Sequence, residues 1–328
     1  MTIKGSDELA LRPPRPDAPS LSNWGVFGDD DEVGTLNYLT PAAVRRGADC
    51  VKTGVAYPLN MPADLPKNRP IGRPDLVKTA HALNLRFGDA ITNDDHVLLA
   101  TQGSSQWDAF VHCGMFEDGV DGAFYNGVKL DDVDEQGYAH RGGIDKVAQR
   151  GIVGRGVLLD IARMVTNGSA EPLPLDFVID ETVYRRCLQH ESIEIASGDI
   201  VCFRTGWSEK YLAADDTERE ALMGHPDLTA MRNPGLSPDM TPLIHAERWA
   251  AVAADNLAVE AFPMPTNFAD SIHIRVLRNL GLPLGEIFLF KSLSEACAAQ
   301  HRWEFQFIAV PMWIPGGMGS PANAIGIC

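Results

Sequence analysis

Short apolar runs rich in β-branched residues alternate with segments of helical periodicity along most of this chain, and this alternation limits the possible folds more than any other feature. Strand-like runs occupy residues 157–160, 200–204, 250–254, 287–290 and 305–310. Helical periodicity fits residues 180–190, 238–251 and 270–280. Strands interspersed with helices of about ten residues predict a mixed α/β domain.

The helix start at Thr40-Pro41, an N-cap residue followed by proline at the first helical position, marks the beginning of the globular part and predicts a helix over residues 42–51. Residues 1–40 are rich in proline and carry an acidic run, so they predict an extended arm rather than a core element. Such an arm packs on its own domain or on a second subunit. No long linker divides residues 41–328, which predicts a single domain.

The net charge restricts the kinds of molecule that the protein can bind. The 28 Lys and Arg residues are opposed by 44 Asp and Glu residues, giving a formal charge of -16, which disfavours binding to nucleic acid or to an anionic membrane. The sequence has neither an apolar run of about 18 residues nor a signal-like N-terminus. Its six cysteines form no C-x-x-C pair, which is typical of reduced thiols. We therefore expect a cytoplasmic protein that acts on a small molecule.

Several common catalytic motifs are absent from the sequence. There is no G-x-S-x-G of the α/β hydrolases, no P-loop motif and no H-E-x-x-H. The glycines of residues 151–156 precede an apolar run instead of following one, so they give poor support for dinucleotide binding.

The segment of residues 101–112 carries the strongest functional signal. In an extended chain residues two apart share a face, so Gln102, Gln106, Asp108 and His112 would point toward one cavity, and Cys113 would turn to the opposite face. Two amides, a carboxylate and an imidazole together can ligate a metal or move a proton.

This segment resembles the signature H-x-G-T-H-x-D-x-P-x-H of the cyclase family of metal-dependent hydrolases. That family includes bacterial kynurenine formamidase, isatin hydrolase and trans-dienelactone hydrolase. Asp108 matches the aspartate and His112 the last histidine, while Gln102 and Gln106 stand at the first two histidines, as in a longer-chain branch with Q-x-x-x-Q-x-D. Further segments that resemble the family in order are residues 34–37, 125–127, 154–160, 204–207, 255–256, 314–317 and 320–321.

The resemblance implies the swivelling β/β/α fold, a homodimer or larger homo-oligomer, and a divalent metal, with zinc expected and manganese the alternative. The family's second metal-binding pair is matched by His273 and Glu286. Carried over residue by residue, the resemblance makes Asp108, His273 and Glu286 the metal ligands. It makes His112 the catalytic acid/base, and Glu286 is expected to take part in catalysis as well. A single-metal site is the simplest interpretation.

A neutral amide oxygen is a weaker zinc ligand than an imidazole. Three roles therefore remain open for the two glutamines. Gln102 and Gln106 would complete the coordination, orient the attacking water or bind the substrate. Trp107, Phe110 and Trp24 are candidates to line a pocket for an aromatic or cyclic substrate.

The activity implied by the resemblance is metal-dependent hydrolysis of a non-peptide amide or lactone. Arylformamidase chemistry, as in tryptophan catabolism, is the leading hypothesis. A trans-dienelactone-type lactonase of aromatic degradation is the alternative, and the glutamine pair favours it. A hypothesis of another class is a catalytically silent, metal-free relative that only binds a ligand.

Overall fold

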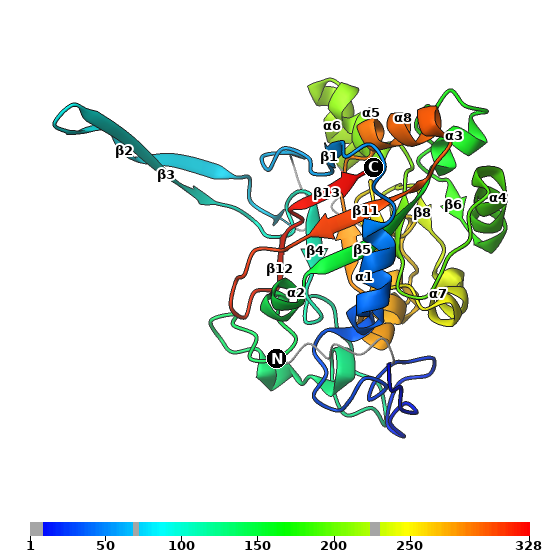
Figure 1. The fold of residues 1–328 in the computed structure, drawn as a ribbon. Helices are drawn as coiled ribbons and strands as arrows, with labels where there is room; N and C mark the ends of the chain where they lie inside the picture. The colour runs from blue at the N-terminus through cyan, green and yellow to red at the C-terminus, as the bar shows by residue number, and fades with distance from the viewer. Residues whose placement is uncertain (1–8, 68–71, 224–229) are drawn as a thin grey trace.

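A nine-stranded mixed sheet forms the centre of the computed structural model, which describes residues 9–67, 72–223 and 230–328 (Figure 1). The strand order is β1-β13-β11-β5-β7-β9-β10-β4-β12. The strands are β1 Ala56–Pro58, β4 Gln106–Asp108, β5 Ile152–Leu159, β7 Ile200–Phe203, β9 Ala251–Ala254, β10 Leu284–Glu286, β11 Glu304–Ala309, β12 Gly319–Pro321 and β13 Ala324–Ile327.

The four central strands β5, β7, β9 and β10 run parallel, and antiparallel strands extend the sheet on both sides. Strands β7 and β9 are buried at every position, as expected for parallel strands covered on both faces. By contrast, the side chains of β11 alternate between buried and half-buried. The predicted mixed α/β architecture is confirmed.

Eight α-helices cover this sheet in the described ranges. They are α1 Pro41–Ala48, α2 Ile144–Arg150, α3 Ile161–Val165, α4 Glu181–Glu191, α5 Trp207–Ala213, α6 Asp216–Met223, α7 Thr241–Glu247 and α8 Lys291–Gln300. The predicted start of α1 is correct, because Thr40 caps the helix by accepting a hydrogen bond from the Ala43 amide. None of the helices in these ranges combines the length and the apolar character needed to cross a bilayer.

Shorter helical turns and a two-stranded sheet also belong to the described ranges. The 3-10 turns are η1 Gly34–Tyr38, η3 Tyr125–Gly127, η4 Leu130–Asp132, η5 Pro238–Met240 and η6 Phe268–Asp270, and η7 His273–Leu280 is a π-helix. β6 Val178–Ile179 and β8 Gly235–Leu236 pair in parallel.

Three predicted elements differ from the structure. The strand expected at residues 287–290 is β10, which ends at Glu286, because Ile287 adopts a left-handed conformation that takes the chain out of the sheet. The helix expected over 238–251 consists of η5 and α7 and ends before β9. The helix expected over 270–280 is divided into η6 and the π-helix η7.

The described part of the N-terminal segment belongs to the body of the protein. Residues 22–26 are buried, and Trp24, Val33, Leu36 and Leu39 join the main hydrophobic core. The segment is therefore not an arm separate from the core, as its proline content had suggested, but lies against its own domain.

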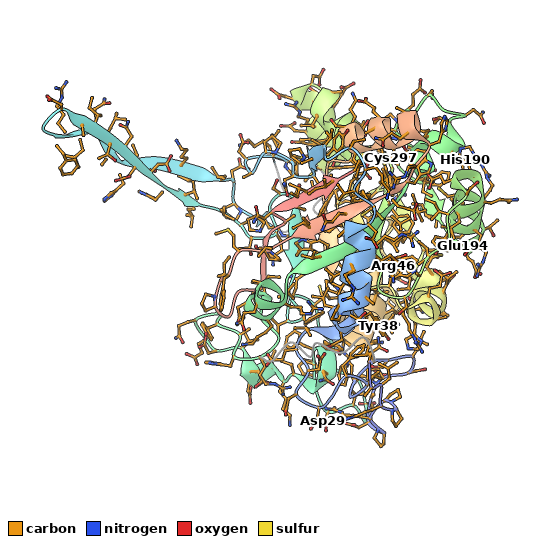
Figure 2. All side chains as sticks on the ribbon, in the orientation of Figure 1. Asp29, Tyr38, Arg46, His190, Glu194 and Cys297 are labelled. Atoms are coloured by element: carbon orange, nitrogen blue, oxygen red, sulfur yellow. The ribbon has the colours of Figure 1, made fainter. Side chains whose placement is uncertain are left out.

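A long antiparallel hairpin, β2 Val77–Phe87 and β3 Ala90–Leu98, projects from the body (Figure 1). Its strands are exposed along nearly their whole length, and its side chains stand out into solvent (Figure 2). The sequence analysis did not anticipate this element.

Candidate metal centre

The short strand β4 places two polar side chains of the candidate site. It lies between β10 and β12 and pairs antiparallel with both, so that Gln106 is opposite Glu286 and Trp107 is opposite Gly285. Because side chains alternate along a strand, Gln106 and Asp108 share one face of β4 and Trp107 points to the other. The Gln106 amide donates a 2.5 Å hydrogen bond to Glu286 Oε2.

The third component is His273, the first residue of η7. One ligand atom each of Asp108, His273 and Glu286 lies within 4.8 Å of the other two, and all three residues are buried. His273 Nε2 is 3.4 Å from Glu286 Oε1 and 3.8 Å from Asp108 Oδ2. The structure thus brings Asp108, from the first third of the chain, next to His273 and Glu286, from its last fifth, and the resemblance assigned all three as ligands.

The donor atoms of this group fit a divalent cation. In the described ranges, both Asp108 oxygens, Glu286 Oε1 and Gln106 Oε1 are buried without a hydrogen-bond partner, and buried polar groups in native proteins are seldom unpaired. Ligands bound tetrahedrally to zinc at about 2.0–2.1 Å lie about 3.3 Å from one another. The distances from His273 Nε2 approach this value, and the set of imidazole and carboxylates suits zinc or manganese.

Glu260 orients the histidine of the site. Its Oε1 accepts a 2.6 Å hydrogen bond from His273 Nδ1, and its Oε2 accepts one from the Ile272 amide. A proton held on Nδ1 leaves the lone pair of Nε2 for the cation, which is the usual arrangement of metal-binding histidines. The sequence analysis missed Glu260, although a lone carboxylate between Val259 and Ala261 signals a buried partner.

Asn256 fixes the backbone next to two carboxylates of the site, Glu260 and Glu286. Its side chain accepts from the Val259 amide and donates to the Val259 carbonyl, and its carbonyl accepts from the Ile287 amide. Val259 and Ile287 have φ values of 59° and 57°, a conformation that is unfavourable for β-branched residues and that occurs often at functional sites. Each of them is the chain neighbour of a site carboxylate, Glu260 or Glu286.

In the metal-free site, burial is the largest single influence on the pKa values of Asp108 and His273. Burial raises the pKa of Asp108 to about 6, with Glu286 adding to the rise and the neighbouring histidines opposing it. Burial lowers the pKa of His273, but the hydrogen bonds to Glu260 and Glu286 and the charge of Glu260 outweigh it and hold that pKa well above the usual value. A protonated imidazole thus neutralises the carboxylates that a cation would otherwise neutralise.

His112 stands on the accessible side of the group. Its Nε2 is 3.8 Å from Asp108 Oδ1, and its side chain is 21% exposed. Burial lowers its pKa despite the opposing effect of Asp108, so that the imidazole is neutral near pH 7. A neutral imidazole next to buried carboxylates is suited to accept a proton.

Cys113 faces the site, which corrects the expectation that it points away. The sulfur of Cys113 and one nitrogen each of His112 and His273 lie within 4.8 Å of one another. The chain turns after β4 instead of remaining extended, so the strict alternation of faces ends there. Burial raises the pKa of the Cys113 thiol to about 11.

The two glutamines have different surroundings. Gln106 contacts Glu286 directly, whereas the Gln102 amide donates to the Met318 carbonyl and its oxygen accepts from the Thr101 hydroxyl. Both ends of the Gln102 side chain are therefore engaged next to β12. The structure brings Gln106 into the group but not Gln102.

The aromatic residues expected to line a pocket lie in the core. Trp107, Phe110 and Trp24 are all 0% exposed. Trp107 packs edge-on against Phe288 on the opposite side of β4 from the site, and Phe110 lies against Tyr125. The Trp24 indole N–H is bonded to the Arg278 carbonyl. These contacts place the three side chains in the core and not on the wall of a pocket.

Arg73 adds a positive charge that no short motif predicted. Its guanidinium donates a 3.1 Å hydrogen bond to the Gln102 carbonyl, and its charge lowers the pKa values of both Asp108 and His112. The residue precedes β2, so it reaches the site from the base of the hairpin.

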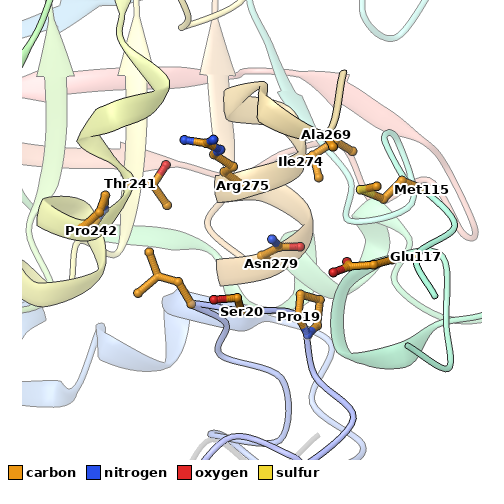
Figure 3. A pocket seen from close by; sticks show the side chains of 11 residues that line it. Pro19, Ser20, Met115, Glu117, Thr241, Pro242, Ala269, Ile274, Arg275 and Asn279 are labelled. Carbon is orange, nitrogen blue, oxygen red and sulfur yellow. The ribbon is translucent and has the colours of Figure 1, made fainter. Parts of the chain in front are cut away.

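A pocket of about 480 Å³ lies between the N-terminal segment and η7 (Figure 3). Met115 and Ile274 line it, as do Ser20, Thr241 and Asn279. The first two follow Cys113 and His273 closely in the chain. The three candidate ligands are not among its lining residues.

The chain is similar to known proteins along most of its length. A family model described as "Putative cyclase" matches residues 51–261. The chain is similar to a crystal structure of a novel cyclase, with 33% identity, 94% of this chain and 100% of the other covered, and a TM-score of 0.82. A search of curated proteins found no significant match.

Two more distant structures share the fold. Isatin hydrolase A from Labrenzia aggregata has 17% identity over 85% of this chain and 94% of its own, with a TM-score of 0.58. Isatin hydrolase A from Ralstonia solanacearum has 16% identity over 87% and 94%, with the same TM-score. The family match over most of the chain, together with the similarity to the cyclase structure over nearly all of it, shows that this protein belongs to the cyclase family.

Proposed function

We infer that the protein is a metal-dependent hydrolase of a non-peptide amide, with arylformamidase-like activity. The observation that carries the proposal is the set of buried, unpartnered oxygens of Asp108 and Glu286 next to His273 Nε2. The fold that the chain shares with isatin hydrolases supports a carbon–nitrogen bond as the target. The expected cofactor is zinc, with manganese as the alternative.

The side chains of the site would have different roles in the reaction. Asp108, His273 and Glu286 would hold the cation, and Glu260 would keep the His273 nitrogen available for it. A bound cation would lower the pKa of water and polarise the substrate carbonyl. His112 would accept the proton of the attacking water and return it to the leaving nitrogen as the carbon–nitrogen bond breaks.

Arg73 would bind the anionic product of this reaction. Hydrolysis of an amide creates a carboxylate, and the guanidinium charge close to Asp108 and His112 offers that anion a partner. The same chemistry applies to a cyclic ester, whose hydrolysis also leaves a carboxylate. Lactone hydrolysis is therefore the second candidate activity.

The test combines metal analysis with substrate assays. Protein purified without chelator is expected to contain close to one equivalent of transition metal and to hydrolyse N-formylkynurenine faster than isatin or dienelactones. Faster lactone turnover would instead select the second activity. Metal content below a few tenths of an equivalent, with no gain on adding zinc or manganese, would indicate a silent ligand-binding relative.

Matched variants locate the site. His112→Ala is expected to lower kcat by about a hundredfold or more while metal is retained, because a general acid/base contributes about 10²–10⁴-fold. Asp108→Ala is expected to lose metal. The controls are His140→Ala and Asp239→Ala, which remove the same groups from exposed positions. Unchanged turnover in both site variants would refute the assignment.

A further inference from the structure

Glu260, the carboxylate that orients His273, lies in an irregular stretch of the chain between β9 and η6. Val259, directly before it, has a φ of 59°, which a β-branched residue adopts only where its surroundings impose it. The geometry of a regular helix or strand therefore does not fix the position of this carboxylate. Contacts with another part of the chain must do so.

The other part of the chain is residues 233–236, which we call the β8 segment. Isolated β-bridges join it to the stretch around Glu260 at both ends, Asn233 to Phe262 and Leu236 to Glu260. Leu236 also exchanges backbone hydrogen bonds of 2.9 and 3.0 Å with the two chain neighbours of Glu260. The two stretches of chain thus lie side by side.

Asn233 binds the stretch around Glu260 through both ends of its side chain. Its Nδ2 donates a 2.9 Å hydrogen bond to the Glu260 carbonyl, and its Oδ1 accepts one of 3.2 Å from the Leu257 amide. The Asn233 carbonyl accepts a third from the Phe262 amide at 2.9 Å. Because Asn233 is 0% exposed, water cannot easily replace these partners, and a buried carbonyl left unpaired is costly.

Gly235 allows the two stretches to approach closely. A Cβ atom at this position would lie 2.5 Å from both the carbonyl carbon and the carbonyl oxygen of Glu260, and 2.5 Å from the Val259 carbonyl oxygen. Carbon atoms in van der Waals contact lie about 3.5–4.0 Å apart. The crowded atoms belong to the backbone, so they cannot turn aside as the end of a long side chain can. The β8 segment therefore determines where the Glu260 backbone lies.

We propose that Asn233 is a positioning residue of the metal centre, which acts through Glu260 on His273. The proposal rests on the proposed metal-dependent function and extends it to a residue of another segment. Glu260 Oε1 accepts the proton of His273 Nδ1 at 2.6 Å. A shift of the carboxylate by about 1 Å would stretch this bond beyond the range of about 2.7–3.2 Å that N–H donors prefer. The proton would then no longer be held on Nδ1, and Nε2 would be less available to a cation.

Zinc affinity tests this role without any substrate. Asn233→Asp keeps the shape of the side chain but replaces the donor Nδ2 by a carboxylate oxygen, which repels the Glu260 carbonyl. Competition with a chromophoric chelator is expected to show zinc binding weakened about 10- to 100-fold, as when the partner of a metal-binding histidine is disturbed. The matched control is Asn126→Asp, because Asn126 is also buried and its Nδ2 donates to backbone carbonyls of the N-terminal segment. The control should lose stability but keep its zinc affinity within about twofold of wild type.

Gly235→Ala perturbs the same point by steric overlap alone. The added methyl group must displace the Glu260 carbonyl, so zinc binding is expected to weaken by about tenfold or more. Its matched control is Gly47→Ala in α1, where a Cβ atom would lie 2.2 Å from the Gly154 carbonyl carbon, a closer overlap outside the metal centre. Unfolding in urea checks that each variant is folded under the conditions of the affinity measurement.

Cobalt(II) bound in place of zinc gives a readout that a loss of stability alone does not change. Its visible absorption depends on the geometry of its ligands, so the spectra of the Asn233 and Gly235 variants are expected to differ from wild type, and those of both controls to match it. Zinc affinities within twofold of the controls, with unchanged cobalt spectra, would overturn the proposal. A wild-type protein that binds zinc but hydrolyses neither amides nor lactones would refute the proposed function alone.

Discussion

Replacing Glu260 with glutamine tests whether the site is built around a metal-binding imidazole. Glu260 satisfies two donors at once, His273 Nδ1 at 2.6 Å and the Ile272 amide at 3.0 Å. Glutamine has one acceptor oxygen, so one of the two donors would face an amide NH₂ group. If Nδ1 loses its acceptor, the proton is no longer fixed there and Nε2 is less available to a cation.

The expected loss follows from the role of this hydrogen bond. Loss of the hydrogen-bond acceptor of a metal-binding histidine typically lowers metal affinity about 10- to 100-fold. This is equivalent to about 1.4 to 2.7 kcal/mol of binding free energy. The assay is competition for zinc with a chromophoric chelator at pH 7.5. Glu247→Gln is the matched control, because Glu247 also bonds two donors, Tyr184 and Trp249, but outside the metal group. An affinity of the Glu260 variant within twofold of the control would refute the role assigned to this carboxylate.

Three further predictions concern pH, charge and stability. Because the pKa of His273 is held well above its usual value and burial holds that of Asp108 near 6 in the metal-free protein, a cation must displace a proton from His273 near pH 7 and a second one from Asp108 below pH 6. Zinc affinity measured by calorimetry should therefore fall about tenfold per pH unit just below pH 7 and more steeply below pH 6; a flat profile from pH 7 to 5 would contradict this. Arg73→Ala removes a charge that lowers the pKa of His112, so the acid limb of the kcat/KM profile should move to higher pH, with Arg73→Lys restoring it; an unmoved limb would place Arg73 outside the site. Arg204→Met leaves the buried Asp160 without its 2.7 Å ion pair and should reduce the free energy of unfolding in urea by about 3–5 kcal/mol; a loss under 1 kcal/mol would show that Arg163 alone satisfies that carboxylate.

The mixed α/β architecture could be predicted from the sequence because the strongest strand signals lie in the buried parallel strands. The runs that became β7 and β9 are continuously apolar, as are residues 157–159 at the end of β5, and a helix cap defined α1. The convergence of Asp108, His273 and Glu286 came from the family pattern, since no local rule relates residues so far apart.

The errors have local causes. Trp107 was assigned to the pocket, although alternation along β4 already places it on the face opposite Gln106. Cys113 was assigned to the far face because the chain was taken as extended beyond the end of β4. The hairpin was missed because its strands have no buried face, although Gly88-Asp89 between two strand-like runs is a typical hairpin turn.

The thiol beside the two histidines affects how the protein should be prepared. Cys113, His112 and His273 offer a sulfur and two nitrogens within 4.8 Å, a combination that attracts thiophilic ions such as cadmium more strongly than the oxygen-rich group does. Such an ion would occupy His273 and immobilise the His112 imidazole. Samples contaminated with thiophilic ions would then be fully loaded yet inactive, so element identity and turnover must be determined on the same batch.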